Sequence, residues 1–143
     1  FLVVGDGPYE QEVRARAPRG TVLTGKLHGT ALSEAFASGD VFLFPSTTDT
    51  FGNVMLEAMA SGLPVIGADV GPTREQLQSG GGWLAAPGDA AAFAAAIITL
   101  IDDRSRVREA AIRALAIAAT KTWDAVWDTL VADYLRLHRP ALR

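Results

Sequence analysis

One stretch, residues 44–64, most restricts the fold of this 143-residue chain. A short apolar run at residues 41–44 ends at a proline, and a polar loop that carries Asp49 follows. Gly52 then leads into an Ala- and Met-rich helical stretch that contains Glu57, and a Gly-Leu-Pro turn introduces a second apolar run. The order is strand, loop, helix, turn and strand. Because ligands of open parallel sheets bind beyond the carboxyl ends of the strands, the loop with Asp49 is where a ligand is expected.

The same alternation continues on both sides of this stretch. Short continuous apolar runs predict strands, and apolar residues at helical spacing predict helices between them, with Thr30 as an expected N-cap. Strands that are apolar on both faces favour a parallel sheet between two layers of helices, so the predicted fold class is an α/β sandwich of three layers. The expected strands are residues 1–4, 21–24, 41–44, 64–68 and 83–85, and the expected helices are residues 8–17, 31–38, 54–61 and 72–78.

In the last third of the chain, the sequence predicts helices and no strands. Asp89 is an expected N-cap for an Ala-rich helix that reaches about residue 101, a second helix is expected at residues 105–119, and a third begins near residue 122. Arg136, His138 and Arg139 suit the negative C-terminal pole of this last helix. Its aromatic side chains are interpreted as packing residues: Trp123, Trp127 and Tyr134.

Composition and charge exclude several classes of function. A net charge of −3 gives no reason to expect a nucleic-acid partner. The absence of cysteine excludes disulfides and thiol chemistry and suits a cytoplasmic location. No apolar run approaches the roughly 18 residues of a membrane span. The length predicts a single domain over residues 1–143, and a first residue already within a strand predicts a piece of a longer protein.

Two carboxylates are expected to flank one anion site. Asp49 lies in the loop, and Glu57 lies about one turn into the helix, with its side chain tilted back toward the loop. Between them, the backbone amides of residues 51–54 are expected to be free at the positive end of the helix dipole. Amides suit a diphosphate and carboxylates suit vicinal hydroxyls, so the predicted ligand is a nucleotide-sugar.

The stretch D-T-F-G-N-V-M-L-E-A-M-A-S-G-L-P-V-I, residues 49–66, resembles the E-x7-E region of retaining glycosyltransferases of family 4. Shorter segments also resemble that family, in order along the chain: V-V-G-D-G-P, L-T-G-K-L, A-S-G-D-V-F-L-F-P-S and G-W-L-A-A-P-G-D. The resemblance implies the C-terminal, donor-binding, Rossmann-like domain of a two-domain GT-B enzyme, with extra helices at the end. Such an enzyme transfers a hexose from a nucleoside diphosphate to an acceptor with retention at the anomeric carbon.

The resemblance also implies roles for individual residues. Glu57 would hold the ribose of the nucleotide. The donor sugar would lie against four residues, which are Asp49, Phe51, Gly52 and Asn53. The amides of Asn53 and Val54 would face the diphosphate, and the base would lie near three residues of the second strand's loop, which are Gly25, Lys26 and Leu27.

The loop sequence resembles that of the mannosyltransferase and sulfoquinovosyltransferase-like branch, which makes GDP-mannose the first expected donor and a UDP-hexose the second. No D-x-D pair implies a metal, and no other cofactor is expected. The chain departs from the family pattern at Asp49, where the family has Glu, and the G-R-L…E-K-G segment expected upstream lies outside it. The N-terminal acceptor domain is therefore the expected partner, and this piece alone is expected not to transfer sugar. Peripheral membrane association of the intact enzyme is left open.

Plainer interpretations stay open for several residues. Glu57 would otherwise be a structural acid of a buried helix, Asp49 a turn or capping aspartate, and Lys26 a solvated surface lysine. The Gly5-Asp6-Gly7-Pro8 segment fits a strand-to-helix turn better than a dinucleotide fingerprint. The alternative function is a catalytically inactive GT-B-like binding or scaffold module, which would be expected to have lost an acid or Gly52.

Overall fold

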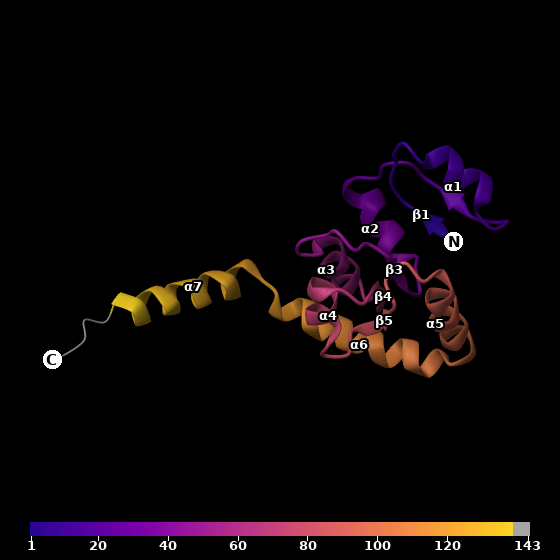
Figure 1. Cartoon of the computed structure of the whole chain (residues 1–143). Coiled ribbons are helices and arrows are strands. Elements are labelled where there is room, and N and C mark those ends of the chain that lie inside the picture. The colour runs from indigo at the N-terminus through magenta and orange to yellow at the C-terminus, as the bar shows by residue number, and fades with distance from the viewer. Residues whose placement is uncertain (139–143) are drawn as a thin grey trace.

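A computed structural model describes residues 1–138, and the predicted alternation of strands and helices is confirmed throughout them (Figure 1). Arg139 and the rest of residues 139–143 lie outside the described part of the chain. In chain order the elements are β1 (Leu2–Val3), α1 (Glu10–Arg16), β2 (Val22–Leu23), α2 (Gly29–Ala37), β3 (Phe42–Phe44), α3 (Asn53–Ala60), β4 (Val65–Ala68), α4 (Gly71–Leu77), β5 (Gly82–Ala85), α5 (Ala90–Asp102), α6 (Arg104–Thr120) and α7 (Trp123–His138).

The core of the molecule is a parallel sheet in the order β3-β4-β5. Side chains alternate between its faces, so Val65 and its neighbour Ile66 enter two different apolar clusters. The Val65 cluster holds side chains of α3, α4 and α6, among them the fully buried Met59, whereas the Ile66 cluster holds side chains of α5, among them Leu100. Helices therefore cover both faces, and the three-layer α/β prediction is confirmed.

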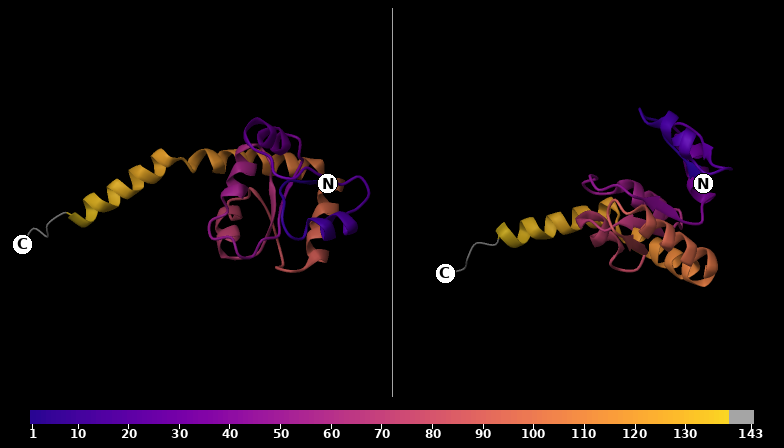
Figure 2. Two further views of the ribbon diagram at one scale, coloured as in Figure 1. Left: turned by 90° about the horizontal axis from the view of Figure 1, so that it is seen from above. Right: turned by 45° about the vertical axis from the view of Figure 1, so that its right-hand side comes forward.

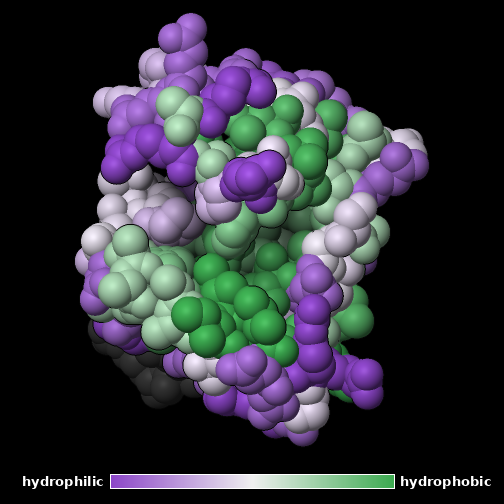
Figure 3. All heavy atoms as spheres, turned by 90° about the vertical axis from the view of Figure 1, so that its right-hand side faces the viewer, coloured by the Kyte–Doolittle hydropathy of each residue, from purple (hydrophilic) through white to green (hydrophobic). Residues whose placement is uncertain are grey.

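The sequence predicts that all five strands form one sheet, and this prediction is wrong. β1 and β2 pair in parallel with each other and form a sheet of their own. Each contains two residues, which allows only a short ladder, and Leu2 and Val22 are exposed rather than covered by helices. Residues 1–27, which contain β1, α1 and β2, form an N-terminal unit. Figure 2 shows that this unit stands apart from the three-stranded sheet, and Figure 3 shows apolar side chains lining a hollow between the unit and α5.

The helix caps explain where the predicted and the observed helix boundaries agree and where they differ. Asp89 accepts hydrogen bonds from the amides of Ala91 and Ala92 at the start of α5, as expected. Thr30 is not an N-cap, because α2 already begins at Gly29, with φ of 54° and no side-chain cap at its start. The unpredicted cap is Asp103, which both ends α5 and caps α6.

The interpretation of the last helix as a packed element is wrong. α7 buries none of its residues, and Figures 1 and 2 show it projecting from the body of the molecule. Its three aromatic side chains, Trp123, Trp127 and Tyr134, are 76%, 56% and 68% exposed. Helical spacing of apolar residues predicts an amphipathic helix, but it does not identify the surface that covers the apolar face. Across the described residues, none of the helices has the length and apolar character needed to cross a membrane.

Candidate functional site

The loop from β3 to α3 is organised around Asp49. Its Oδ1 accepts a hydrogen bond of 3.0 Å from the amide of Phe51 and a second from the amide of Gly52. Aspartate commonly bonds the backbone two or three residues onward in this way. Gly52 has φ of 77°, a left-handed conformation that glycine adopts without steric cost, and it is the N-cap residue of α3.

These bonds correct the expectation that all the amides of residues 51–54 are free. The amides of Phe51 and Gly52 are taken by Asp49, as expected for a turn aspartate. The amides of Asn53 and Val54 have no acceptor among residues 1–138, because they precede the first bond of the helix, from Met55 to the carbonyl of Gly52. The site therefore offers two free N–H donors at the positive end of the α3 dipole.

Glu57 is exposed on the side of α3, five residues into the helix. Its carboxylate forms no ion pair or hydrogen bond with any residue of the described chain, and the hydroxyl of Ser61 donates to its backbone carbonyl instead. Because Glu57 is exposed, its carboxylate is solvated and reachable by a ligand. The structure thus leaves the Glu57 carboxylate available to a ligand, and no bond joins it to Asp49.

The residues expected near the base lie in the N-terminal unit. Gly25 accepts a hydrogen bond of 2.8 Å from the amide of Gly5, and Lys26 forms a 3.1 Å ion pair with Asp6. Leu27, half-buried, follows in the connection to α2. The structure therefore joins Gly25 and Lys26 to the turn after β1. The predicted site residues that lie in one continuous turn beside Glu57 are Asp49, Phe51, Gly52, Asn53 and Val54.

One residue outside the turn contacts it and was not predicted from the sequence. Gln76, on α4, donates a hydrogen bond from Nε2 to the carbonyl of Phe51. Its Oε1 is buried and has no partner. Nothing in the local sequence signals this contact, because the two residues are 25 positions apart and meet only when α4 packs beside β4.

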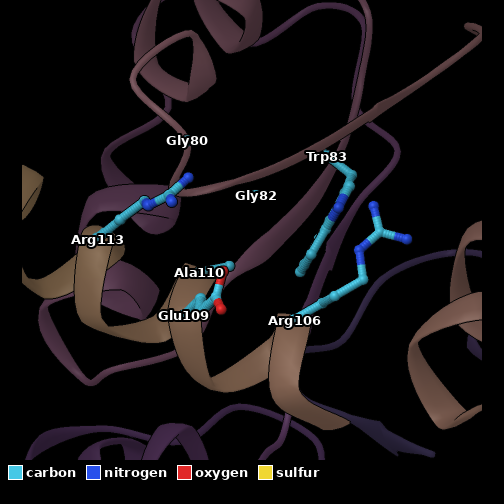
Figure 4. Close-up of a pocket in the computed structure, with 7 residues that line it drawn as sticks. All are labelled: Gly80, Gly82, Trp83, Arg106, Glu109, Ala110 and Arg113. Carbon is cyan, nitrogen blue, oxygen red and sulfur yellow. The ribbon is translucent and has the colours of Figure 1, made fainter. Parts of the chain in front are cut away.

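A separate cavity and an ion pair involve none of the predicted site residues. A cavity of about 160 Å³ between β5 and α6 contains none of the predicted site residues (Figure 4). Its lining consists of Gly80, Gly82, Trp83, Arg106, Glu109, Ala110 and Arg113.

A hydrogen bond and ion pair with Asp69 raise the pKa of Arg74, which is on the solvent side of α4. In the part of the chain that the structure describes, no three His, Cys, Asp or Glu side chains gather as a metal site.

Comparison with known proteins identifies the family. Residues 1–103 match the family described as "Glycosyl transferases group 1". A sulfoquinovosyl transferase of Arabidopsis thaliana is 42% identical over 106 residues, which is 71% of this chain and 21% of that protein. A GDP-mannose-dependent alpha-mannosyltransferase of Mycolicibacterium smegmatis is 38% identical over 136 residues, which is 94% of this chain and 35% of that protein.

Solved structures agree with this assignment. A sucrose-phosphate synthase from Thermosynechococcus elongatus superimposes with a TM-score of 0.80 at 27% identity, covering 95% of this chain and 38% of the other. An Anabaena protein solved in complex with UDP and glucose gives 0.75 at 28% identity, covering 94% and 40%. The predicted fold class of the chain, that of the GT-B glycosyltransferases, is confirmed. The chain spans between about a fifth and two fifths of these proteins, and its sequence and fold together show that it belongs to the group 1 glycosyl transferases.

Proposed function

We propose that this chain is the donor-binding domain of a retaining glycosyltransferase, which moves a hexose from a nucleoside diphosphate to an acceptor. The observation that carries the proposal is the pairing of two free amides, at Asn53 and Val54, with the unpartnered carboxylate of Glu57. All three groups follow the carboxyl end of β3, where ligands of parallel sheets bind.

Each group has a chemical role in the proposal. The two amides bind the diphosphate and stabilise the negative charge that grows on it as the bond to the sugar breaks. The Glu57 carboxylate accepts hydrogen bonds from the ribose hydroxyls. Asp49 has one oxygen committed to its own turn, so its Oδ2 is the oxygen that faces the donor sugar, next to Phe51, Gly52 and Asn53.

The proposed donor is GDP-mannose, with a UDP-hexose second. The first is supported by the relative named as a GDP-mannose-dependent alpha-mannosyltransferase, and the second by the neighbour solved with UDP and glucose. The base would lie near Gly25, Lys26 and Leu27, where Lys26 is 65% exposed. Binding of the base there requires the N-terminal unit to lie close to α3 when the nucleotide is bound.

The chain matches only a part of the length of its relatives. This supports a partner domain within the same protein, which would hold the acceptor. In this proposal the acceptor domain supplies the second wall of the site. The cytoplasmic location, with or without peripheral association with a membrane, stays a prediction.

The proposal is tested by calorimetric titration of the full-length protein with GDP-, UDP- and ADP-sugars. Glu57→Ala and Glu57→Gln are compared with wild type, since both remove the charge and the second keeps the shape. A hydrogen bond to a charged group contributes about 1.5–3 kcal/mol, so either variant should weaken the preferred donor roughly tenfold or more.

Glu109→Gln is the matched control, because Glu109 is also an exposed helical glutamate but lies on α6 at the separate cavity. It should bind like wild type. Absence of binding of every nucleotide-sugar by the wild-type protein would refute the proposed function, and equal affinity in the Glu57 variants would refute the role given to Glu57.

A further inference from the structure

The peptide unit between Phe51 and Gly52 is held at both of its polar ends. Its N–H, on Gly52, donates to Asp49, and its C=O, on Phe51, accepts from Nε2 of Gln76. Because a peptide unit is planar, fixing both ends fixes its orientation. The next two amides along the chain, those of Asn53 and Val54, are the free donors of the site.

We propose that Gln76 is a positioning residue of the donor site, which orients the turn at residues 51–52 so that the amides of Asn53 and Val54 face the diphosphate of a nucleotide-sugar. The inference rests on the proposed function and adds to it a residue from a different element. Gln76 acts through the Phe51 carbonyl and does not itself contact the ligand.

The helix that carries Gln76 is firmly anchored. Thr73 and Leu77, on either side of it in α4, are 1% and 4% exposed, and Leu77 packs in the main core cluster. Gln76 also lies close against the turn, since a Cβ placed on Gly52 would meet its Nε2 at 3.3 Å. A donor carried on a firmly packed helix holds a neighbouring loop more precisely than a donor carried on a loop.

The other end of the Gln76 side chain shows that stability alone does not account for this residue. A carbonyl only accepts hydrogen bonds, so Nε2 must face Phe51, and Oε1 is then turned into a buried position without a partner. A buried acceptor left unpaired destabilises the folded state. Methionine, which has a similar length and no such oxygen, would avoid that cost but would leave the Phe51 carbonyl untethered.

The test compares Gln76→Met with wild type in the full-length protein, with Gln78→Met as control. Gln78 is exposed at the end of the same helix and makes no side-chain hydrogen bond to any described residue. Titration with GDP-mannose and UDP-glucose gives the affinity, thermal unfolding gives the stability, and hydrogen exchange of the peptide covering residues 49–56 reports on the turn.

In Gln76→Met the affinity should fall by about three- to tenfold, as expected for one lost hydrogen bond. Exchange of residues 49–56 should become faster, and Tm should stay within about 2 °C of wild type or rise, since the loss of the Phe51 bond is offset by removal of the unpaired oxygen. Gln78→Met should change none of the three. A loss of affinity without a loss of Tm separates positioning from a general structural role.

Gln76→Glu adds a pH readout. An ionised glutamate cannot donate to the Phe51 carbonyl, whereas a protonated one can. The ratio of the variant's Kd to that of wild type should therefore fall toward one as the pH is lowered through about 4.3.

Wild-type affinity in Gln76→Met, an affinity loss matched by a drop in Tm, or a pH-independent Kd ratio in Gln76→Glu would each overturn the positioning role. These results leave wild-type nucleotide binding intact, so they are distinct from failure of the proposed function, in which wild type itself binds no nucleotide-sugar.

Discussion

Replacement of Gly52 by alanine tests the geometry of the site turn directly. The backbone of Gly52 has φ of 77°, and residues with a Cβ adopt this conformation at a cost. A Cβ at this position would also overlap the terminal methyl group of Met55, which is fully buried, and would touch Gln76. The substitution therefore imposes two separate penalties, one on the backbone and one on the packing below it.

The two penalties can be given magnitudes. A left-handed conformation costs an L-residue about 1–2 kcal/mol. Inserting a methyl group into a packed core costs about 1–3 kcal/mol, and the lower half of that range applies because methionine adapts its rotamer. The free energy of unfolding should therefore fall by about 2–4 kcal/mol, which corresponds to roughly 5–15 °C in Tm for a chain of this size.

Urea unfolding followed by circular dichroism measures this change, with Gly71→Ala as the matched control. Gly71 is in the first turn of α4, has an ordinary φ, and has open space where a Cβ would be placed. Alanine there should be neutral or stabilise the protein by about 0.4–1 kcal/mol. If Gly52→Ala unfolds at the same urea concentration as wild type, then neither the left-handed backbone at residue 52 nor the packing of Met55 beneath it is as described, and the description of the turn is wrong.

Two further predictions concern the helix caps. Asp89→Ala should lower the free energy of unfolding by about 1 kcal/mol in the same urea assay, because it removes the acceptor for two amides of α5, whereas Asp89→Asn should retain most of the stability. At the start of α6, the Ser105 hydroxyl and the Arg106 amide lower the pKa of Asp103. A lowered folded-state pKa means that this contribution is complete above the unfolded value of 3.8 and is lost as the pH falls through the folded value. Stability measured across that acid range should therefore depend less on pH in Asp103→Asn than in wild type, and identical pH profiles would contradict the cap.

Local physical chemistry explains which parts of the fold were predictable from the sequence. The strands β3 and β4 are continuous apolar runs, and such runs are stable only between two layers of helices. The cap at Asp89 depends on amides two and three residues away, so its signal is local. The order of strand and helix around Glu57 predicts where the candidate site lies, beyond the carboxyl end of β3.

The parts that could not be predicted depend on contacts between distant residues. The sequence contains β1 and β2 as apolar runs, but their separation into a second sheet is set by which strands pair, and pairing is a tertiary property. The sequence pattern correctly predicts that α7 is an amphipathic helix, but it cannot predict whether the apolar face is packed, since no local pattern specifies the covering surface. Gln76 and Phe51 are 25 positions apart in the sequence, so no local pattern near either residue predicts their hydrogen bond.

The replacement of glutamate by Asp49 at the first acid of the motif gains a physical explanation from the turn. An aspartate carboxylate is short enough to reach amides two and three residues onward, which is the pattern observed at Phe51 and Gly52. A glutamate has one more methylene and loses that local geometry, so its carboxylate would extend from the loop. With aspartate, one oxygen builds the turn and the other is left for a ligand, while two amides are withdrawn from anion binding. The number of free N–H groups at the start of α3 is thereby set at two. In the proposed function these two groups face the diphosphate, and the peptide unit that Asp49 and Gln76 hold between them sets their direction.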